Sequence, residues 1–260
     1  MKLKLYQVDA FADKAFGGNP AAIVPLEAWL SDDILQKIAQ ENNLSETAFF
    51  VKNTNYYELR WFTPNHEVDL CGHATLAAAY VIFNRLKYQE DKVEFQTRSG
   101  LLIVTKSSHM LTMDFPAQSI FPCDINEALI RGLGNITPIE TLNGVDYVVR
   151  LESEEAILNI KPNPTLLMQL DLRGVCVTAP GNRVDFVSRF FAPKLAVPED
   201  PVTGSAHCYL TPYWSAILGK NDLHANQISS RGGEIFCQLR KNRVFLSGKS
   251  ILFMEGSIQF

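Results

Sequence analysis

The feature that most constrains the fold is an internal repeat, whose period is close to half of the 260-residue chain. Three pairs of similar segments occur in the same order in the two halves: RWFTP at 60–64 and RFFAP at 189–193, LCGHA at 70–74 and VTGSA at 202–206, and TRSG at 97–100 and SRGG at 230–233. Two copies are too few for a solenoid, in which at least three stacked repeats bury a continuous core. The repeat therefore predicts two similar lobes that face each other.

Runs rich in β-branched and aromatic residues predict that both lobes are built mainly from strands. The expected strands are 3–10, 21–24, 47–51, 56–62, 93–97, 101–106 and 111–115 in the first half, and 174–178, 186–191, 227–230, 234–239, 244–247 and 251–258 in the second half. A helix is expected from Ser31 to about Asn43, where apolar residues recur with helical spacing, and shorter helices are expected near Asp124 and Pro164. Helices are also expected in two apolar runs, 74–83 and 206–218. Pro212 should kink or shorten the second of them, because an interior proline typically costs about 3 kcal/mol.

A polar segment with two prolines, PAQSIFP at 116–122, suggests a boundary between the lobes. We expect an N-terminal lobe at 1–118 and a C-terminal lobe at 119–260, with the last strand able to return to the N-terminal lobe. The predicted class is a mixed α/β (α+β) protein with two pseudo-symmetric lobes.

Each lobe is expected to present the N-terminus of a buried helix. The run 74–83 is apolar on every side apart from Thr75, which is typical of a helix surrounded by protein. The first N–H groups of such a helix have no intrahelical partner, and its N-terminus attracts anions. Gly72 and, in the second copy, Gly204 with Ser205 would let a ligand approach the backbone. If the lobes face each other, both N-termini border one cleft suited to a small carboxylate; the alternative is a helix capped by its own loop.

Three side chains are candidates for acid–base chemistry. Glu46 lies beside apolar residues in NNLSETAFFV, so partial desolvation suits it to proton transfer near neutral pH. His73 could donate a hydrogen bond or relay a proton, and Asp200 in EDPVTGSA could orient a substrate or accept a proton. The simpler alternatives are an exposed turn glutamate, a structural histidine and a loop-capping aspartate. The 129-residue offset of the repeat pairs Glu46 with Val175, so one proton-transfer group is favoured over a two-base racemase.

Other chemistries lack their sequence signatures. Neither Cys71 with His73 nor His207 with Cys208 has the spacing of a zinc finger or ribbon, so no metal is expected. No GxGxxG, GxxxxGK[ST] or GxSxG motif occurs. The net charge of −4 favours neither a nucleic-acid nor a membrane partner. The five scattered cysteines form no CxxC pair and are expected to be reduced thiols of a cytoplasmic protein.

Five ordered motifs span most of the chain: QVDAF at 7–11, FGGNPAAIV at 16–24, NNLSETAFF at 42–50, RWFTPNHEVDLCGHATLA at 60–77 and EDPVTGSAH at 199–207. Together they resemble the motifs of the phenazine-biosynthesis PhzF-like isomerase family. The resemblance implies the fold of diaminopimelate epimerase, in which two pseudo-symmetric lobes each wrap a curved, mostly antiparallel sheet around a central helix. It also implies an isomerase that works without a cofactor or metal and forms a homodimer.

The founding activity of that family isomerises dihydro-3-hydroxyanthranilate by moving a proton between ring carbons with one glutamate. The resemblance implies that Glu46 is the general acid/base in this chain. The substrate carboxylate would be held by Gly72, His73, Gly204 and Ser205. Asp200 would contact the amino or hydroxyl end of the substrate, and Asn19 would border the pocket.

Two alternatives to this isomerase remain open. Related epimerases and proline racemases use two cysteines at the helix N-termini, whereas this chain has Cys71 before Gly72 but Thr203 before Gly204. The first alternative is an amino-acid epimerase that uses Cys71 with another base. The second is a binding protein that kept the fold and lost catalysis.

Overall fold

Strands form most of both halves of the chain. The computed structural model describes residues 1–260, and its strands and helices group into two units. Unit 1 contains Met1–Phe115 and Phe245–Phe260, and unit 2 contains Pro116–Val244. A mixed, mostly antiparallel architecture with two similar parts agrees with the fold class that the repeat predicts.

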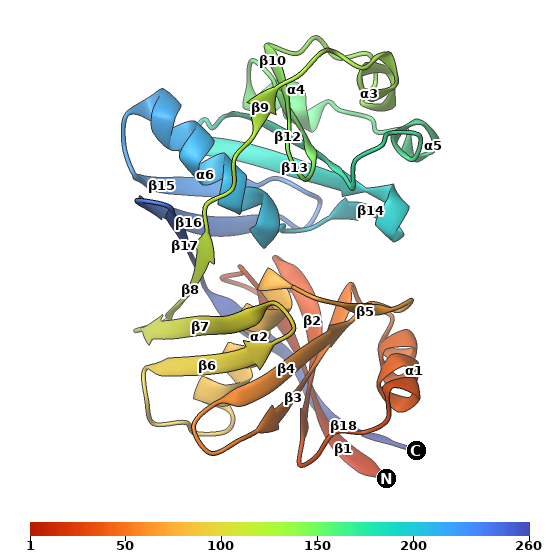
Figure 1. Cartoon of the computed structure of the whole chain (residues 1–260), viewed down its shortest axis with the longest axis vertical. Helices are drawn as coiled ribbons and strands as arrows, with labels where there is room; N and C mark the ends of the chain where they lie inside the picture. Colours follow the sequence, from red (N-terminus) through yellow and green to blue (C-terminus); the bar gives the residue numbers. More distant parts are fainter. The chain divides into compact units, whose positions relative to one another are not determined.

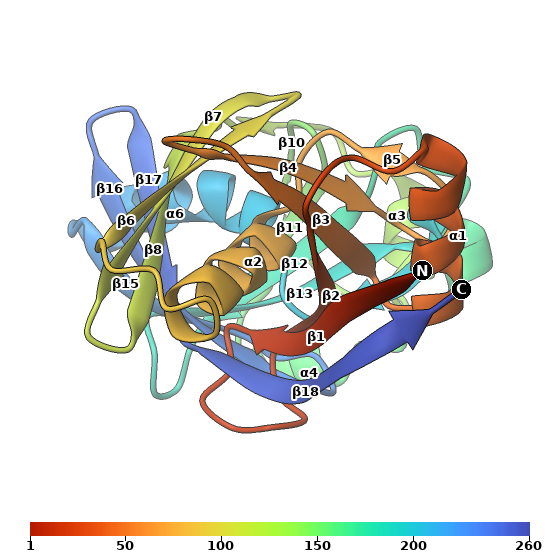
Figure 2. The same ribbon diagram turned by 90° about the horizontal axis from the view of Figure 1, so that it is seen from below.

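The boundary between the units differs from the one expected at 118/119. Unit 2 starts at Pro116, and the residues after Val244 belong to unit 1, as the expected return of the last strand to the N-terminal lobe allows. The return is explained by β18 (Ser250–Gln259), which pairs antiparallel with β1 (Lys2–Ala10) along almost its whole length. The chain ends therefore lie side by side, as both ribbon views show (Figures 1 and 2).

Unit 1 combines a sheet with two helices (Figure 1). Besides β1 and β18, its strands are β2 (Asn19–Leu26), β3 (Glu46–Lys52), β4 (Tyr57–Phe62), β5 (Glu67–Val68), β6 (Lys92–Thr97), β7 (Gly100–Ser107) and β8 (Met110–Pro116). Its helices are α1 (Asp32–Asn42) and α2 (Gly72–Asn84). The strand β17 (Arg243–Gly248) carries the chain back from unit 2.

The strand pairs of unit 1 alternate in direction. β1 with β2, β3 with β4, and β6 with β7 are antiparallel, whereas β2 with β3 and β4 with β6 are parallel. Parallel neighbours require a crossover connection, and α1 and α2 lie in those two connections. Figure 2 shows α2 lying against β1 and β2, and all but three of its thirteen residues are buried. The apolar run therefore forms the central helix of unit 1.

Unit 2 has more, shorter elements. Its strands are β9 (Phe121–Pro122), β10 (Glu140–Asn143), β11 (Tyr147–Arg150), β12 (Val175–Pro180), β13 (Phe186–Ala192), β14 (Val197–Asp200), β15 (Asp222–Gln227) and β16 (Gly233–Arg240). Its helices are α3 (Glu127–Gly132), α4 (Glu154–Leu158), α5 (Pro164–Leu167), α6 (Gly204–Leu218) and the 3-10 turn η1 (Pro193–Leu195).

The internal repeat of the sequence reappears in the topology of the two units. β10 with β11, β12 with β13, and β15 with β16 are antiparallel, whereas β11 with β12 and β13 with β15 are parallel. This order of directions is the same as in unit 1, and α6 takes the place of α2 in the second parallel crossover. The repeated arginines also match. Nε of Arg60 lies 2.7 Å from Oε1 of Glu67, and Nε of Arg189 lies 2.7 Å from Oε1 of Glu199. Each glutamate lies on the short strand before the central helix of its unit, β5 or β14.

Pro212 neither ends nor shortens α6, so the expected shortening is wrong, whereas the expected kink stays a prediction. The helix continues through Pro212 to Leu218. A proline removes the N–H that would bond to the carbonyl four residues earlier, here that of Cys208. That carbonyl instead accepts a hydrogen bond from the Gln118 N–H at 3.0 Å, so no buried acceptor is left unpaired.

Other elements of unit 2 also differ from the sequence-based expectation. The strand expected at 227–230 is β15, which ends where the expected strand begins, at Gln227. Polar residues alternate along β15. Gln227 is buried, and its amide is paired in hydrogen bonds. The helix expected near Asp124 starts at Glu127, because the Asn126 side chain caps it. The elements β10, β11 and α4 are not predicted at all.

Two further observations concern the whole chain. All five cysteines are free thiols. None of the helices has the combination of length and apolar character that crossing a membrane requires.

Candidate functional site

The N-terminus of α2 lacks the side-chain cap that the short helices of unit 2 have. Asn126, Ser153 and Asn163 accept hydrogen bonds from first-turn N–H groups of α3, α4 and α5. Cys71 occupies the N-cap position of α2 in an extended conformation, and its side chain makes no such bond. Gly72, the first helical residue, has no side chain to keep a ligand away. The first backbone N–H groups of α2 can therefore donate hydrogen bonds to an oxygen atom of a ligand.

Glu46 and His73 form the central pair of this site. Glu46 is the first residue of β3 and lies opposite Ala21 of β2, and His73 follows the first residue of α2. The Oε2 atom of Glu46 lies 3.0 Å from Nε2 of His73. The Glu46 side chain is 17% exposed, so the carboxylate is held by the imidazole and can still be reached from outside.

Asn19 contacts the other nitrogen of the same ring. Its Nδ2 lies 3.2 Å from Nδ1 of His73. With the amide donating to Nδ1, the proton of the neutral ring is on Nε2. Gly18 makes this placement possible: its φ is +63°, and a Cβ there would lie 2.1 Å from the Ala10 carbonyl oxygen. Only glycine fits such a position.

The charges of Cys71, His73 and Glu46 are coupled. Burial, assisted by the Glu46 carboxylate, raises the pKa of the Cys71 thiol to about 11, so this thiol is protonated at neutral pH. Burial opposes a charge on His73, whereas the negative Glu46 carboxylate beside it favours one, and the pKa of His73 is raised well above its usual value. A doubly protonated ring requires the Asn19 amide to present its oxygen to Nδ1. The cluster can thus hold a proton and pass it on.

The same cluster offers three kinds of metal ligand. One oxygen of Glu46, one ring nitrogen of His73 and the sulfur of Cys71 lie within 4.8 Å of one another, and Zn²⁺ binds all three atom types. The second pair considered from sequence forms no such group: Nδ1 of His207 donates to the Thr203 carbonyl at 2.9 Å, and the neighbouring Cys208 thiol donates to a backbone carbonyl. Only the α2 cluster could therefore serve both proton transfer and metal binding.

The N-terminus of α6 has a similar construction in unit 2. Thr203 is the N-cap residue without a side-chain cap, and its hydroxyl donates to Oδ2 of Asp200 at 2.5 Å. Gln227 fixes this loop from β15. Its Oε1 accepts from the Thr203 N–H at 2.9 Å, and its Nε2 donates to the Asp200 carbonyl at 2.7 Å. Gly204 is buried and Ser205 is partly exposed.

Arg173 is a candidate that the sequence does not predict. Its Nε and Nη2 bond the two carboxylate oxygens of Asp146 at 3.0 and 2.7 Å, and Nη2 lies 3.3 Å from the Ser205 hydroxyl. Asp146 and Arg173 stand shortly before β11 and β12, which are parallel neighbours. Residues at the same end of two parallel strands lie close together. Recognising β11 would therefore have revealed the pair.

The residues expected to form the site lie in two groups. Unit 1 brings together Asn19, Glu46, Gly72 and His73, with Cys71 added. Unit 2 brings together Asp200, Gly204 and Ser205, with Arg173 added. The roles expected for these residues stay predictions.

The register of the strands corrects the expected partner of Glu46 in the repeat. Thr47 pairs with Phe62 in unit 1, and Val175 pairs with Phe191 in unit 2. Since Phe62 and Phe191 correspond in the repeat, the position equivalent to Glu46 is Gly174 and not Val175. The connection between the two paired strands is one residue longer in unit 2 (181–185) than in unit 1 (53–56), which the sequence alone does not reveal. Neither residue is acidic, so unit 2 has no second carboxylate at this position.

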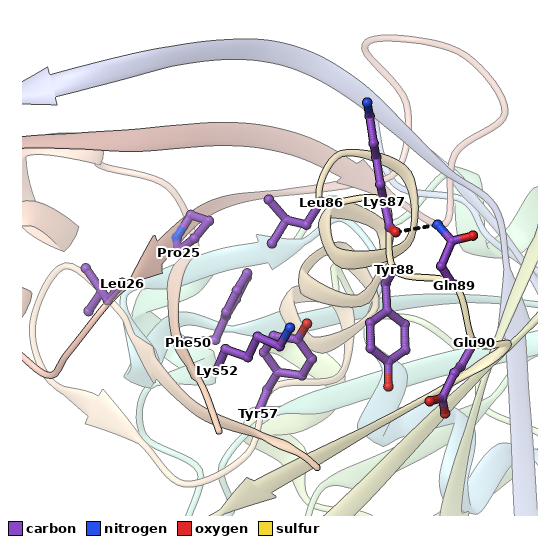
Figure 3. A pocket seen from close by; sticks show the side chains of 10 residues that line it. All are labelled: Pro25, Leu26, Phe50, Lys52, Tyr57, Leu86, Lys87, Tyr88, Gln89 and Glu90. Atoms are coloured by element: carbon purple, nitrogen blue, oxygen red, sulfur yellow. Dashed lines mark hydrogen bonds between the residues drawn. The ribbon is translucent and has the colours of Figure 1, made fainter. Parts of the chain in front are cut away.

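A pocket of about 430 Å³ lies elsewhere in unit 1 (Figure 3). It is lined by Pro25, Leu26, Phe50, Lys52, Tyr57, Leu86, Lys87, Tyr88, Gln89 and Glu90. The Lys87 side chain points away from the other lining residues in Figure 3. None of the residues predicted for the site lines this pocket. The candidate site is therefore defined by side-chain pairs at the two helix N-termini and not by this pocket.

Comparison with known proteins gives consistent results over the full chain. The family model described as phenazine biosynthesis-like protein (PhzC-PhzF) matches residues 8–256. A protein of Pseudomonas aeruginosa named as an uncharacterized isomerase is 51% identical over 258 residues, covering 99% of each chain. The crystal structure of a PhzF-family phenazine biosynthesis protein of Enterococcus faecalis has a TM-score of 0.98 and 47% identity, and the match covers 100% of both chains.

A more distant structure agrees in fold alone. A probable proline racemase of Agrobacterium radiobacter has a TM-score of 0.63 at 10% identity, with 99% of this chain and 92% of that chain covered. The two-part epimerase-like fold is thus shared well beyond the range of clear sequence similarity. On the family match and the close relatives, this chain belongs to the phenazine biosynthesis-like (PhzC-PhzF) family, among whose members are proteins named as isomerases.

Proposed function

We propose that this protein is an isomerase that moves a proton within a small carboxylate-bearing molecule, with Glu46 as the acid/base group and without a cofactor. The observation that carries the proposal is the contact of 3.0 Å between Glu46 and His73 at the uncapped N-terminus of α2. The names of close relatives as isomerases support the reaction class.

The proposed step is balanced within the substrate. The Glu46 carboxylate takes a proton from a substrate carbon, and the electron pair of the broken C–H bond enters the adjacent π-system. The resulting carboxylic acid, which is partly exposed and can exchange its proton with solvent, gives a proton to a different carbon, and the double bond shifts. The charged ring of His73, whose Nε2 lies 3.0 Å from Oε2 of Glu46, fixes one carboxylate oxygen electrostatically while the other oxygen transfers the proton. A fixed acid/base group needs no reorganisation during the reaction.

An epimerase that uses Cys71 is the second candidate. Its support is the position of Cys71 Sγ, 3.5 Å from Nδ1 of His73. Against it stand the pKa of about 11 for Cys71 and the presence of Thr203 at the equivalent N-cap position. A thiol that stays protonated is a poor base, and a two-thiol mechanism lacks its second thiol.

Substitution of Glu46 and of Cys71 separates the candidates. The assay measures deuterium uptake from D₂O into dihydro-3-hydroxyanthranilate and other small unsaturated carboxylates by NMR, with and without a chelator. Glu46→Gln should lower the rate about 10²–10⁴-fold with an unchanged melting temperature, because the amide keeps the shape and loses the proton transfer. Cys71→Ala should keep most of the rate, and the chelator should not change it.

Four results would contradict the proposal. A Glu46→Gln variant as fast as the parent protein rules out the glutamate. A Cys71→Ala variant without activity favours the epimerase, and loss of activity with the chelator favours a metal at the cluster. Absence of exchange into every compound favours a binding protein that has lost catalysis.

A further inference from the structure

A second pocket of unit 1, with a volume of about 320 Å³, lies away from the Glu46–His73 pair. All the residues that line it belong to unit 1. One of them is Asn84, the last residue of α2, whereas His73 lies in the first turn of that helix. At a rise of about 1.5 Å per residue, the two residues are about 17 Å apart along the helix axis. The pocket is therefore separate from the candidate functional site.

Positive charge dominates the lining of this pocket. Three cationic residues line it: Arg85 after α2, Lys106 of β7 and Lys249 before β18. Only Arg85 among them forms an ion pair, in which its Nε lies 4.0 Å from Oε2 of Glu255. The one carboxylate in the lining is that of Asp13. The protein therefore leaves an excess of positive charge around the pocket, although the chain as a whole has a net charge of −4.

Two lining residues have hydrogen-bonding groups that the protein does not use. Nζ of Lys106 donates to Oδ1 of Asn84 at 3.2 Å and lies 5.6 Å from the centre of the Phe83 ring. An ammonium group has three N–H donors, so further donors stay available. Ser250 lines the pocket and is 8% exposed, and its hydroxyl has no hydrogen-bond partner in the protein. Since nearly all buried polar groups are paired, an unpaired hydroxyl in the wall of a cationic pocket favours a ligand with oxygen atoms.

The remaining lining suits an apolar group. Tyr80 of α2, Leu111 of β8 and Ile251 of β18 contribute apolar surface to the pocket. Leu111 is buried, and the other two are half-buried. Pockets for small molecules typically have volumes of about 300–1,000 Å³ and combine apolar walls with a few polar groups. The pocket therefore has the size and the lining for an organic anion and not only for an inorganic ion.

We propose that this pocket binds a small organic phosphate, with the phosphate group at Arg85, Lys106 and Lys249 and the organic group against Tyr80. A phosphate ester carries a charge of about −1.5 to −2 at neutral pH. Three cations and one carboxylate give the lining a net charge of +2, which a phosphate ester matches and a single carboxylate does not. Arginine and lysine both bind phosphate oxygens through charge-assisted hydrogen bonds. The proposed isomerase reaction neither requires nor excludes this ligand.

Titration of the full chain with phenyl phosphate, inorganic phosphate and phenol tests the proposal. The backbone amides of Lys106 and Lys249 are followed by NMR at constant ionic strength. Phenyl phosphate should shift both signals saturably, inorganic phosphate should do so with lower affinity, and phenol should not shift them. The double variant Lys106→Gln with Lys249→Gln should bind phenyl phosphate about tenfold more weakly, because each lost charge on a surface costs about threefold. Asp13→Asn should bind it about threefold more tightly, since the one lining carboxylate is removed.

The matched control is Lys37→Gln, which removes an exposed lysine of α1 that does not line the pocket. It makes the same change in net charge as either single lysine substitution and should leave the affinity unchanged. Parent-like affinity in the double lysine variant, or saturable shifts only at residues outside the pocket, would overturn the site. Inorganic phosphate bound as tightly as phenyl phosphate would overturn the organic ligand in favour of the free ion. Asp13→Asn keeps all the cations, so its tighter binding is a second test if the double variant has a lower melting temperature.

Discussion

Two buried histidines near the starts of the central helices have opposite electrostatic environments. The pKa of His73 is raised well above its usual value, because the negative Glu46 carboxylate beside it counteracts the effect of burial. Burial lowers the pKa of His207 to about 4, and its one compensating partner is the Thr203 carbonyl. His207 is therefore a neutral structural residue, whereas His73 belongs to a proton-carrying cluster.

The neutral His207 should make the fold sensitive to acid. Its folded pKa of about 4 lies below the ordinary value of 6.5, so the unfolded chain takes up the proton first. The contribution of neutral His207 to the free energy of unfolding is fully present above pH 6.5. It decreases as the pH falls toward 4, by up to about 3 kcal/mol over this range. His207→Gln keeps a donor for the Thr203 carbonyl and should flatten the pH dependence of the free energy of unfolding, measured with urea.

The matched control for that measurement is His109→Gln. His109 is an exposed histidine of unit 1. Its replacement should leave the pH dependence of the free energy of unfolding as it is in the parent protein. If His207→Gln and the parent protein lose stability equally between pH 6.5 and pH 4, the buried ring is not the cause.

At the level of single residues, the sequence predicts the unit 1 site better than the unit 2 site. Glu46, His73 and Asn19 lie in specific motifs, and the structure brings them into contact. Arg173 and Asp146 are 27 residues apart and meet only because β11 and β12 are adjacent. Such long-range pairs depend on strand order, which local sequence patterns do not encode.

At the level of elements, the two central helices were predictable from their apolar runs, but their surroundings were not. A run that is apolar on all sides indicates a buried helix, and α2 confirms it, whereas the last residues of α6, 216–218, are exposed. The continuation of α6 through Pro212 depends on Gln118, far away in sequence. The short strands β10 and β11 have too few residues for a clear alternation pattern.

The strand β15 should stabilise the α6 N-terminus through Gln227. This buried side chain bonds the Thr203 N–H and the Asp200 carbonyl. Gln227→Ala would leave these groups unpaired in the interior, at a cost of about 1–3 kcal/mol, measured as the free energy of unfolding in urea. Gln238→Ala on neighbouring β16, which removes an exposed hydrogen bond to Asp222, should cost far less. Equal losses in the two variants would contradict this role.

On the scale of the whole molecule, the repeat predicted two similar parts, and both have the same order of strand directions. The division of the chain was less predictable. Unit 1 is discontinuous because β18 pairs with β1, and a pairing between chain ends has no local signal in sequence.

Removal of β18 should damage unit 1 selectively. A chain that ends at Lys249 exposes the backbone edge of β1, because that strand loses its antiparallel partner. Hydrogen exchange followed by mass spectrometry should show fast exchange in β1 and slow exchange in β12, which lies in unit 2. Slow exchange in β1 of the shortened chain would show that the last strand is dispensable.

The pairing of the last strand with the first also sets an order of events during synthesis. Domains usually fold from the N-terminus onward as the ribosome releases them. Here the inner segment Pro116–Val244 is released complete while unit 1 still lacks its closing strand. The first residues to be translated therefore cannot complete their sheet until the last residues are made. The middle of the nascent chain can reach its native structure before either end does.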